Sequence, residues 1–312
     1  MDNTTRVAVG LAVLGRPAYI NVGSDAELPG ERTVEAMREL TETVLDEAYS
    51  AGVRRVDVAR SYGRAEEFLA GWLADRGHAD VVVSSKWGYA YVGEWRRDSG
   101  VHEVKEHSLS RFRAQWAETR ALLGDVLSLY QVHSLTLDSP LFTDEPLLAE
   151  LAALRSDGIR VGFSTSGPEQ ASTIRRALEL TVDGEPVFTA VQSTWNPLEP
   201  SAGLALAEAH AEGILVQAKE TLANGRLAVD PPFEVDALAT VHDVSPDAVA
   251  LAAAFAQPWA DVVLLGPAGT GQLESNLAGA RLRLTGDELE TLAELRQLPS
   301  EYWAHRSTLD WQ

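Results

Sequence analysis

The hydrophobic pattern of the chain alternates between two periods. Short apolar runs rich in Val, Ile and Leu are each followed by a longer stretch in which apolar residues recur at helical spacing. The run at 55–58, for example, is followed by a helical stretch at 65–76 that ends before Gly77. Strands that alternate with helices pair in parallel and need right-handed crossovers. The pattern therefore predicts an α/β fold built on a parallel sheet.

The alternation continues along the whole chain. It gives seven or eight strand–helix units, depending on how the opening run at 6–15 is counted, and no linker rich in Pro, Gly or Ser divides them. We expect one (β/α)8 TIM barrel over residues 1–312, with an aromatic tail at about 298–312 and the active site at the C-terminal rim of the strands. Further strands are expected at 81–85, 126–131, 160–164, 187–193, 214–218 and 262–265, and further helices at 33–51, 108–123, 145–157, 168–180, 202–212, 245–257, 270–280 and 285–297.

Composition narrows the function classes. The formal net charge of −20 argues against nucleic acid or an anionic membrane surface as a partner. The chain has no cysteine, which excludes disulfides, a thiol nucleophile and thiolate metal sites, and we expect no bound metal. No apolar run is long enough to cross a bilayer and no signal peptide opens the chain, so we expect a cytoplasmic protein.

Four polar residues follow the ends of predicted strands. Asp57 and Tyr62 lie in VRRVDVARSYG, Lys86 in VVVSSKWG and His133 in LYQVHS. Parallel strands gather such residues at one rim. A lysine ammonium lowers the pKa of a nearby tyrosine from ~10, an aspartate holds that ammonium, and a histidine can orient a carbonyl group. The set can donate a proton to a carbonyl oxygen, and the hydride that completes a reduction points to a nicotinamide cofactor.

The segments around these residues resemble the aldo-keto reductase family. VDVARSYG, SSKWG and LYQVHS are similar to its aspartate–tyrosine, lysine and histidine segments, and the resemblance continues, in order, through GFSTSG, QSTWNPLEP and LLGPAGTGQLESNL. It implies a barrel enzyme that reduces an aldehyde or ketone with NADPH or NADH, with Tyr62 as the proton donor. For the cofactor, it implies contacts of Ser164 and Gln192 with the nicotinamide carboxamide, stacking of Trp195 on the nicotinamide ring, Lys219 beside the pyrophosphate, and Gly266, Gln272 and Asn276 around the adenosine.

The predicted adenosine turn departs from the family pattern. Gly266 to Gly271 has the spacing of a phosphate-binding P-loop, but Gln272 replaces its lysine, so we discount a nucleoside-triphosphate site. Relatives that prefer NADP usually carry Lys or Arg here, and this chain has neither between Val262 and Ala280. We expect less than ~10²-fold discrimination between NAD and NADP, and an arginine at position 268 or 269 to favour NADP.

Aromatic residues after Lys86 and in the tail predict an apolar pocket for a small-molecule substrate, formed by Trp87, Tyr91 and Trp303. Three functions stay open: a carbonyl reductase, an NAD-dependent sugar or alcohol dehydrogenase that runs the same site in reverse, and a nicotinamide-binding regulatory subunit. The four-residue set argues against the last. The substrate and the oligomeric state also stay open.

Overall fold

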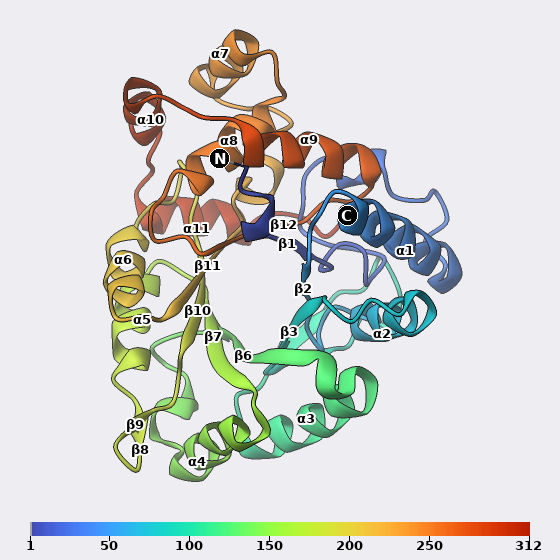
Figure 1. Cartoon of the computed structure of the whole chain (residues 1–312), viewed down its shortest axis with the longest axis vertical. Coiled ribbons are helices and arrows are strands. Elements are labelled where there is room, and N and C mark those ends of the chain that lie inside the picture. The colour runs from blue at the N-terminus through green and yellow to red at the C-terminus, as the bar shows by residue number, and fades with distance from the viewer. Residues whose placement is uncertain (1) are drawn as a thin grey trace.

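The computed structural model describes residues 2–312 and confirms the predicted barrel (Figure 1). Eight strands close in the order β1-β12-β11-β10-β7-β6-β3-β2, and every neighbouring pair is parallel. The opening run therefore does form a strand. The barrel strands are β1 (Val7–Gly10), β2 (Arg55–Asp57), β3 (Val82–Trp87), β6 (Leu127–Leu135), β7 (Arg160–Thr165), β10 (Ala190–Thr194), β11 (Leu215–Lys219) and β12 (Val262–Leu265).

Helices surround the strands on the outside (Figure 1). Their ends follow local signals in the sequence: the Thr33 hydroxyl accepts from the Ala36 N–H at the start of α1, and Gly77 ends α2 in the left-handed conformation with φ 67°. The surrounding helices are α1 (Val34–Ser50), α2 (Ala65–Arg76), α3 (Leu109–Leu123), α4 (Glu145–Ala153), α5 (Gln170–Leu178), α6 (Gly203–Ala211), α8 (Pro246–Phe255) and α9 (Thr270–Arg281).

Several elements decorate this barrel. α10 was expected, whereas α7, α11 and two short hairpins were not. These elements are α7 (Phe233–His242), α10 (Gly286–Ala293), α11 (Pro299–Ser307), the hairpins β4 (Tyr89–Tyr91) with β5 (Glu103–Lys105) and β8 (Thr181–Val182) with β9 (Glu185–Pro186), and the 3-10 helices η1 (Thr4–Arg6), η2 (Ser24–Ala26), η3 (Gly124–Val126), η4 (Pro140–Thr143), η5 (Leu154–Asp157) and η6 (Ala223–Gly225).

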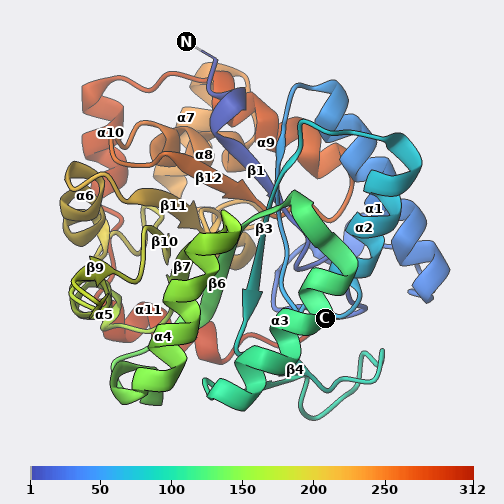
Figure 2. The same ribbon diagram turned by 60° about the horizontal axis from the view of Figure 1, so that its bottom comes forward.

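Two of these additional elements, α11 and β4, lie at the same end of the barrel. Figure 2 shows α11 and β4 at the end toward which the β3 arrow points, and the N-terminus at the opposite end. The last residue of the chain returns to the same rim, because the backbone of Gln312 forms two hydrogen bonds with that of Tyr19, at 3.0 and 3.1 Å. Within residues 2–312, none of the helices is long and apolar enough to cross a membrane.

Candidate active site

Three strands and one loop bring the four predicted catalytic side chains together. Asp57 ends β2, Lys86 lies in β3, His133 lies in β6, and Tyr62 lies between β2 and α2. The Lys86 ammonium donates to the Asp57 carboxylate and, over 3.3 Å, to the Tyr62 hydroxyl. The rings of Tyr62 and His133 meet edge to face, with centroids 5.5 Å apart. The four side chains therefore form one continuous cluster at the C-terminal ends of the strands.

The Asp57 carboxylate holds the Lys86 side chain in place through a network of hydrogen bonds. Asp57 and Lys86 are each only 1% exposed. Besides Lys86, the carboxylate accepts from the Ser84 hydroxyl at 2.7 Å and from the Gln192 amide at 3.2 Å. A buried ion pair is tolerated when further hydrogen bonds satisfy its remaining lone pairs. This network holds the ammonium next to the Tyr62 phenol.

The protonation of Tyr62 follows from its surroundings. Burial raises the pKa of Tyr62 well above 10, the Asp57 carboxylate raises it further, and the Arg16 guanidinium opposes the rise. The sequence interpretation, in which Lys86 lowers this pKa, gave the wrong net direction. The physical reason is that the phenol is buried and that Asp57 already pairs with the ammonium. Tyr62 therefore stays protonated at neutral pH, as a proton donor must.

His133 is a neutral imidazole. Burial lowers the pKa of His133 well below 6.5, and the neighbouring Lys86 and Lys219 cations lower it further. Its Nδ1 lies 3.3 Å from the Ser61 hydroxyl, which can donate to it. In that tautomer Nε2 carries the proton. A neutral ring with one free N–H can donate a hydrogen bond to a carbonyl oxygen.

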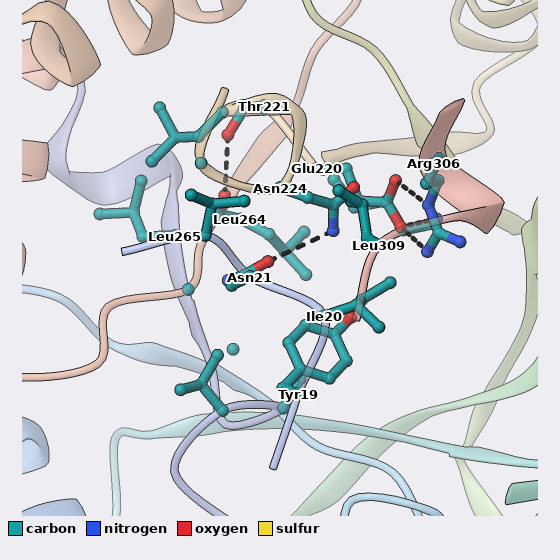
Figure 3. Close-up of a pocket in the computed structure, with 18 of the residues that line it drawn as sticks. Tyr19, Ile20, Asn21, Glu220, Thr221, Asn224, Leu264, Leu265, Arg306 and Leu309 are labelled. Atoms are coloured by element: carbon teal, nitrogen blue, oxygen red, sulfur yellow. Dashed lines mark hydrogen bonds and ion pairs between the residues drawn. The ribbon is translucent and has the colours of Figure 1, made fainter. Parts of the chain in front are cut away.

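A cavity of about 540 Å³ begins at this cluster and runs along the rim to α9. Asp57, Tyr62 and His133 line one end, and Gln272 and Asn276 line the other. Figure 3 shows part of the wall between these ends, where Thr221 bonds the Leu264 carbonyl and Asn224 bonds Asn21. The cavity is thus elongated and joins the Asp57–Tyr62–Lys86–His133 cluster to the predicted adenosine turn.

Three buried amide oxygens along this cavity have no hydrogen-bond partner in the described part of the chain. They are Gln192 Oε1, Asn224 Oδ1 and Asn276 Oδ1, on side chains no more than 5% exposed. Buried polar atoms are nearly always paired, so these oxygens point to a ligand that carries several donors. Amide and hydroxyl groups spread along a dinucleotide match that requirement, so the residues present fit a nicotinamide cofactor.

Five of the seven predicted cofactor residues line the cavity, and two do not. Ser164 is fully buried, and its hydroxyl accepts from the Ser134 N–H at 2.8 Å. Trp195 is 7% exposed and packs edge to face on Trp259, with centroids 5.8 Å apart, because it turns outward from the end of β10. The expected stacking platform is therefore part of the core. The five lining residues are Gln192, Lys219, Gly266, Gln272 and Asn276.

A partly buried charge cluster forms the wall after β11 (Figure 3). Arg306 donates to both oxygens of the Glu220 carboxylate, at 2.5 and 2.8 Å, and Lys219 lies 3.4 Å from it. Burial raises the pKa of Glu220, but Arg306 and Lys219 outweigh burial and bring it to about 2. Glu220 also holds a left-handed backbone with φ 51°. The ion pair with Arg306 stabilises this strained position in the cavity wall.

The aromatic residues expected in the substrate pocket lie outside the cavity. Trp87 is fully buried and packs on Phe112, because successive strand residues face opposite ways and Lys86 points into the barrel. Tyr91 lies in the β4–β5 hairpin, and its hydroxyl accepts from the Trp95 N–H at 3.1 Å. Trp303 is 8% exposed and packs against its helix neighbour Tyr302. These three predictions are corrected.

Residues that the sequence did not indicate complete the end of the cavity at Tyr62 and His133. The Arg16 guanidinium is buried, lies over the Tyr62 ring at 5.1 Å and over the Trp311 ring at 4.9 Å, and donates to Glu103 at 2.7 Å. Tyr19 packs against Trp311 from the side, with centroids 5.9 Å apart. Arg16 follows the first strand closely, a signal that sequence reasoning could have used. Glu103 lies in the β4–β5 hairpin and Trp311 in the C-terminal tail. The sequence carries no comparable signal in either segment.

The comparisons with known proteins all point to one protein family. The model of the aldo/keto reductase family matches residues 26–297. The chain is 25% identical over 296 residues to aldo-keto reductase str7 from Strobilurus tenacellus, covering 83% of this chain and 82% of that protein. It is 29% identical over 223 residues to an aldo-keto reductase from Mycobacterium sp. (strain KMS), covering 70% and 72% of the two chains. The solved structure of the glycerol dehydrogenase AKR11B4 from Gluconobacter oxydans shares the fold with a TM-score of 0.68 at 21% identity, over 93% of this chain and 90% of that one.

Proposed function

Because this chain belongs to the aldo/keto reductase family of oxidoreductases, we propose that it reduces an aldehyde or ketone to an alcohol at the cavity end lined by Tyr62 and His133. Family membership implies carbonyl reduction that depends on NAD(P)H. The observation that carries the proposal is the 3.3 Å hydrogen bond from the Lys86 ammonium to the Tyr62 hydroxyl, above the buried Asp57 carboxylate.

Tyr62 is the proton donor in this proposal. Its raised pKa keeps the phenol protonated until a carbonyl oxygen becomes more basic during reduction. The phenolate that remains lies beside the Lys86 ammonium, which offsets the cost of a buried negative charge. The neutral His133 ring orients the carbonyl oxygen by donating from Nε2. General acid catalysis of this kind contributes ~10²–10⁴-fold in rate.

The cofactor would lie along the elongated cavity. Gln192 would hold the carboxamide of the nicotinamide, and Asn224, Gln272 and Asn276 would hold the adenosine half. When bound, the reduced nicotinamide supplies the hydride that no side chain can supply. Lys219 is partly buried and paired with the Glu220 carboxylate, so it contributes a weak attraction for the pyrophosphate.

The reverse reaction, oxidation of a polyol with NAD, is the second candidate. Glu103 places a partly exposed carboxylate at the catalytic end, where it can accept hydrogen bonds from the hydroxyls of a polyol. A structural neighbour is named a glycerol dehydrogenase. The third reading, a regulatory subunit without turnover, does not account for the connected Tyr62–Lys86–Asp57 cluster.

One set of assays separates these readings. Purified protein is given NADH or NADPH with a panel of aldehydes and ketones, and NAD or NADP with glycerol and larger polyols. Tyr62→Phe should lower turnover at least ~10²-fold while cofactor binding persists, and the control Tyr91→Phe, outside the cavity, should keep wild-type rates. Dinucleotide binding without turnover on any substrate would favour the regulatory reading. Turnover that survives in Tyr62→Phe would overturn the proposed mechanism.

A further inference from the structure

A carboxylate lies at the N-terminus of α9. Glu27 precedes α1 in the segment that passes over this helix, and its Oε2 accepts from the Gly271 N–H at 3.1 Å. Glycine permits the approach: a β-carbon at Gly269 would overlap the Glu27 carboxylate, and one at Gly271 would come within 2.7 Å of it. The N-terminus of a helix attracts anions through its free N–H groups and its dipole. In this chain that position already holds a negative charge.

The neighbouring end of the cavity offers a buried, unpaired hydrogen-bond acceptor to a ligand. Asn276 is 3% exposed, and its Oδ1 has no partner among the described residues, although it lines the cavity. Its amide nitrogen donates to the Asp247 carboxylate at 2.5 Å, so a second acidic group faces the same region. Gln272 lines the cavity and donates to the Gly23 carbonyl at 3.3 Å, which connects this end to the segment that carries Glu27.

Basic residues are confined to the other end of the cavity. Arg16, Lys219 and Arg306 are the only Lys or Arg residues among the described lining residues, and each contacts a carboxylate there. The adenosine end thus has the Asp247 carboxylate and an unpaired amide oxygen in its wall, and the Glu27 carboxylate lies next to it at the start of α9. Hydroxyl groups can donate to such acceptors, whereas a phosphate cannot and would be repelled.

We propose that Glu27 makes the cavity selective for an unphosphorylated adenosine ribose, so that the protein binds NAD(H) in preference to NADP(H). This inference rests on the proposed function as a nicotinamide-dependent oxidoreductase. The Glu27 carboxylate accepts a hydrogen bond from a ribose hydroxyl and excludes a 2′-phosphate by charge. The same pairing of an acidic side chain with a ribose 2′-hydroxyl is used by other dinucleotide-binding folds.

Direct binding measurements test the inference without catalysis. Dissociation constants for NADH, NADPH, AMP and 2′-phospho-AMP are measured by calorimetry on the wild type, Glu27→Gln and the exposed control Glu31→Gln. Wild type should bind NADH about tenfold more tightly than NADPH, a difference of about 1.4 kcal/mol. Glu27→Gln should tighten NADPH and 2′-phospho-AMP by about tenfold and change NADH less than threefold. The control should match the wild type.

The failure of this inference and that of the proposed function give different results. If NADH and NADPH both bind but their ratio is the same in wild type and Glu27→Gln, Glu27 does not select the ribose and the inference is wrong. A wild type that prefers NADPH also overturns it, with the catalytic proposal intact. If neither dinucleotide binds to a wild type with a normal thermal unfolding transition, the proposed function itself fails.

Discussion

The indole ring of Trp311 lies flat on the imidazole of His102, with centroids 4.2 Å apart and 11° between the planes. The same indole lies over the Arg16 guanidinium, which in turn lies over the ring of Tyr62. The backbone hydrogen bonds between Gln312 and Tyr19 anchor the end of the tail. Trp311 therefore forms part of the wall at the Tyr62 end of the cavity, and Gln312 holds the tail in place.

Trp311→Ala should weaken substrate binding specifically. An aromatic contact contributes about 0.5–1.5 kcal/mol, so the KM of the carbonyl substrate should rise about two- to tenfold. The dissociation constant of NADH should change less than twofold, because the adenosine end is far along the cavity. Steady-state kinetics and calorimetry check both values, with Trp95→Ala as an aromatic control outside the cavity. Weaker NADH binding with an unchanged KM would contradict this role.

Lys86→Met should lower both activity and stability. Without the ammonium, the phenolate of Tyr62 loses its partner and turnover should fall ~10²–10⁴-fold. The substitution also leaves the Asp57 carboxylate buried without a counter-ion, which costs about 3–5 kcal/mol in the free energy of unfolding. The double variant Asp57→Asn with Lys86→Met should regain much of that stability but none of the activity. Urea unfolding and initial rates measure the two effects; a single variant as stable as wild type would count against the buried pair.

Acid should destabilise the protein through His107. Burial lowers the pKa of His107 to about 4, and its Nε2 donates to the His133 carbonyl at 2.8 Å. Between about pH 6.5 and 4 the unfolded chain binds a proton at this residue that the folded chain does not. Stability from His107 is therefore complete above pH 6.5 and decreases as the pH falls toward 4, by about 3 kcal/mol.

The pH dependence of unfolding in His107→Asn tests that assignment. This variant should be less stable than the wild type at pH 7 and should lose less stability between pH 6.5 and 4. The exposed His305→Asn should retain the wild-type slope. An identical slope in His107→Asn and wild type would show that another group titrates.

The sequence predicted the barrel and the convergence of the four polar side chains because both depend on local signals. Alternating periods define the strands, and a polar residue at the end of a strand faces the rim, as Asp57 and Lys86 do. The placement of side chains beyond the strand ends was harder to predict. Trp195 follows β10 directly but turns into the core, and Trp311 reaches the site only because the tail pairs with Tyr19. Such placements depend on tertiary packing between distant segments, which no local pattern reports.

The sequence-based expectation that one arginine at the adenosine turn favours NADP needs revision. Ala268 is fully buried, and a side chain at Gly269 meets the Glu27 carboxylate. The Gly269 backbone itself is extended, with φ −171°, so any residue fits its conformation. Gly269→Arg alone should therefore displace the Glu27 segment and weaken the binding of both NADH and NADPH.

Removal of the opposing side chain should reveal the effect of the arginine. In the double variant Glu27→Gly with Gly269→Arg, the guanidinium can pair with a 2′-phosphate through charge-assisted hydrogen bonds, which contribute ~1–2 kcal/mol, or roughly 5- to 30-fold in affinity. The NADPH dissociation constant should fall by that factor relative to Glu27→Gly alone, while that of NADH stays within threefold. Calorimetry on the four combinations gives the coupling between the two positions. Additive effects would mean that Glu27 and residue 269 do not share the same space.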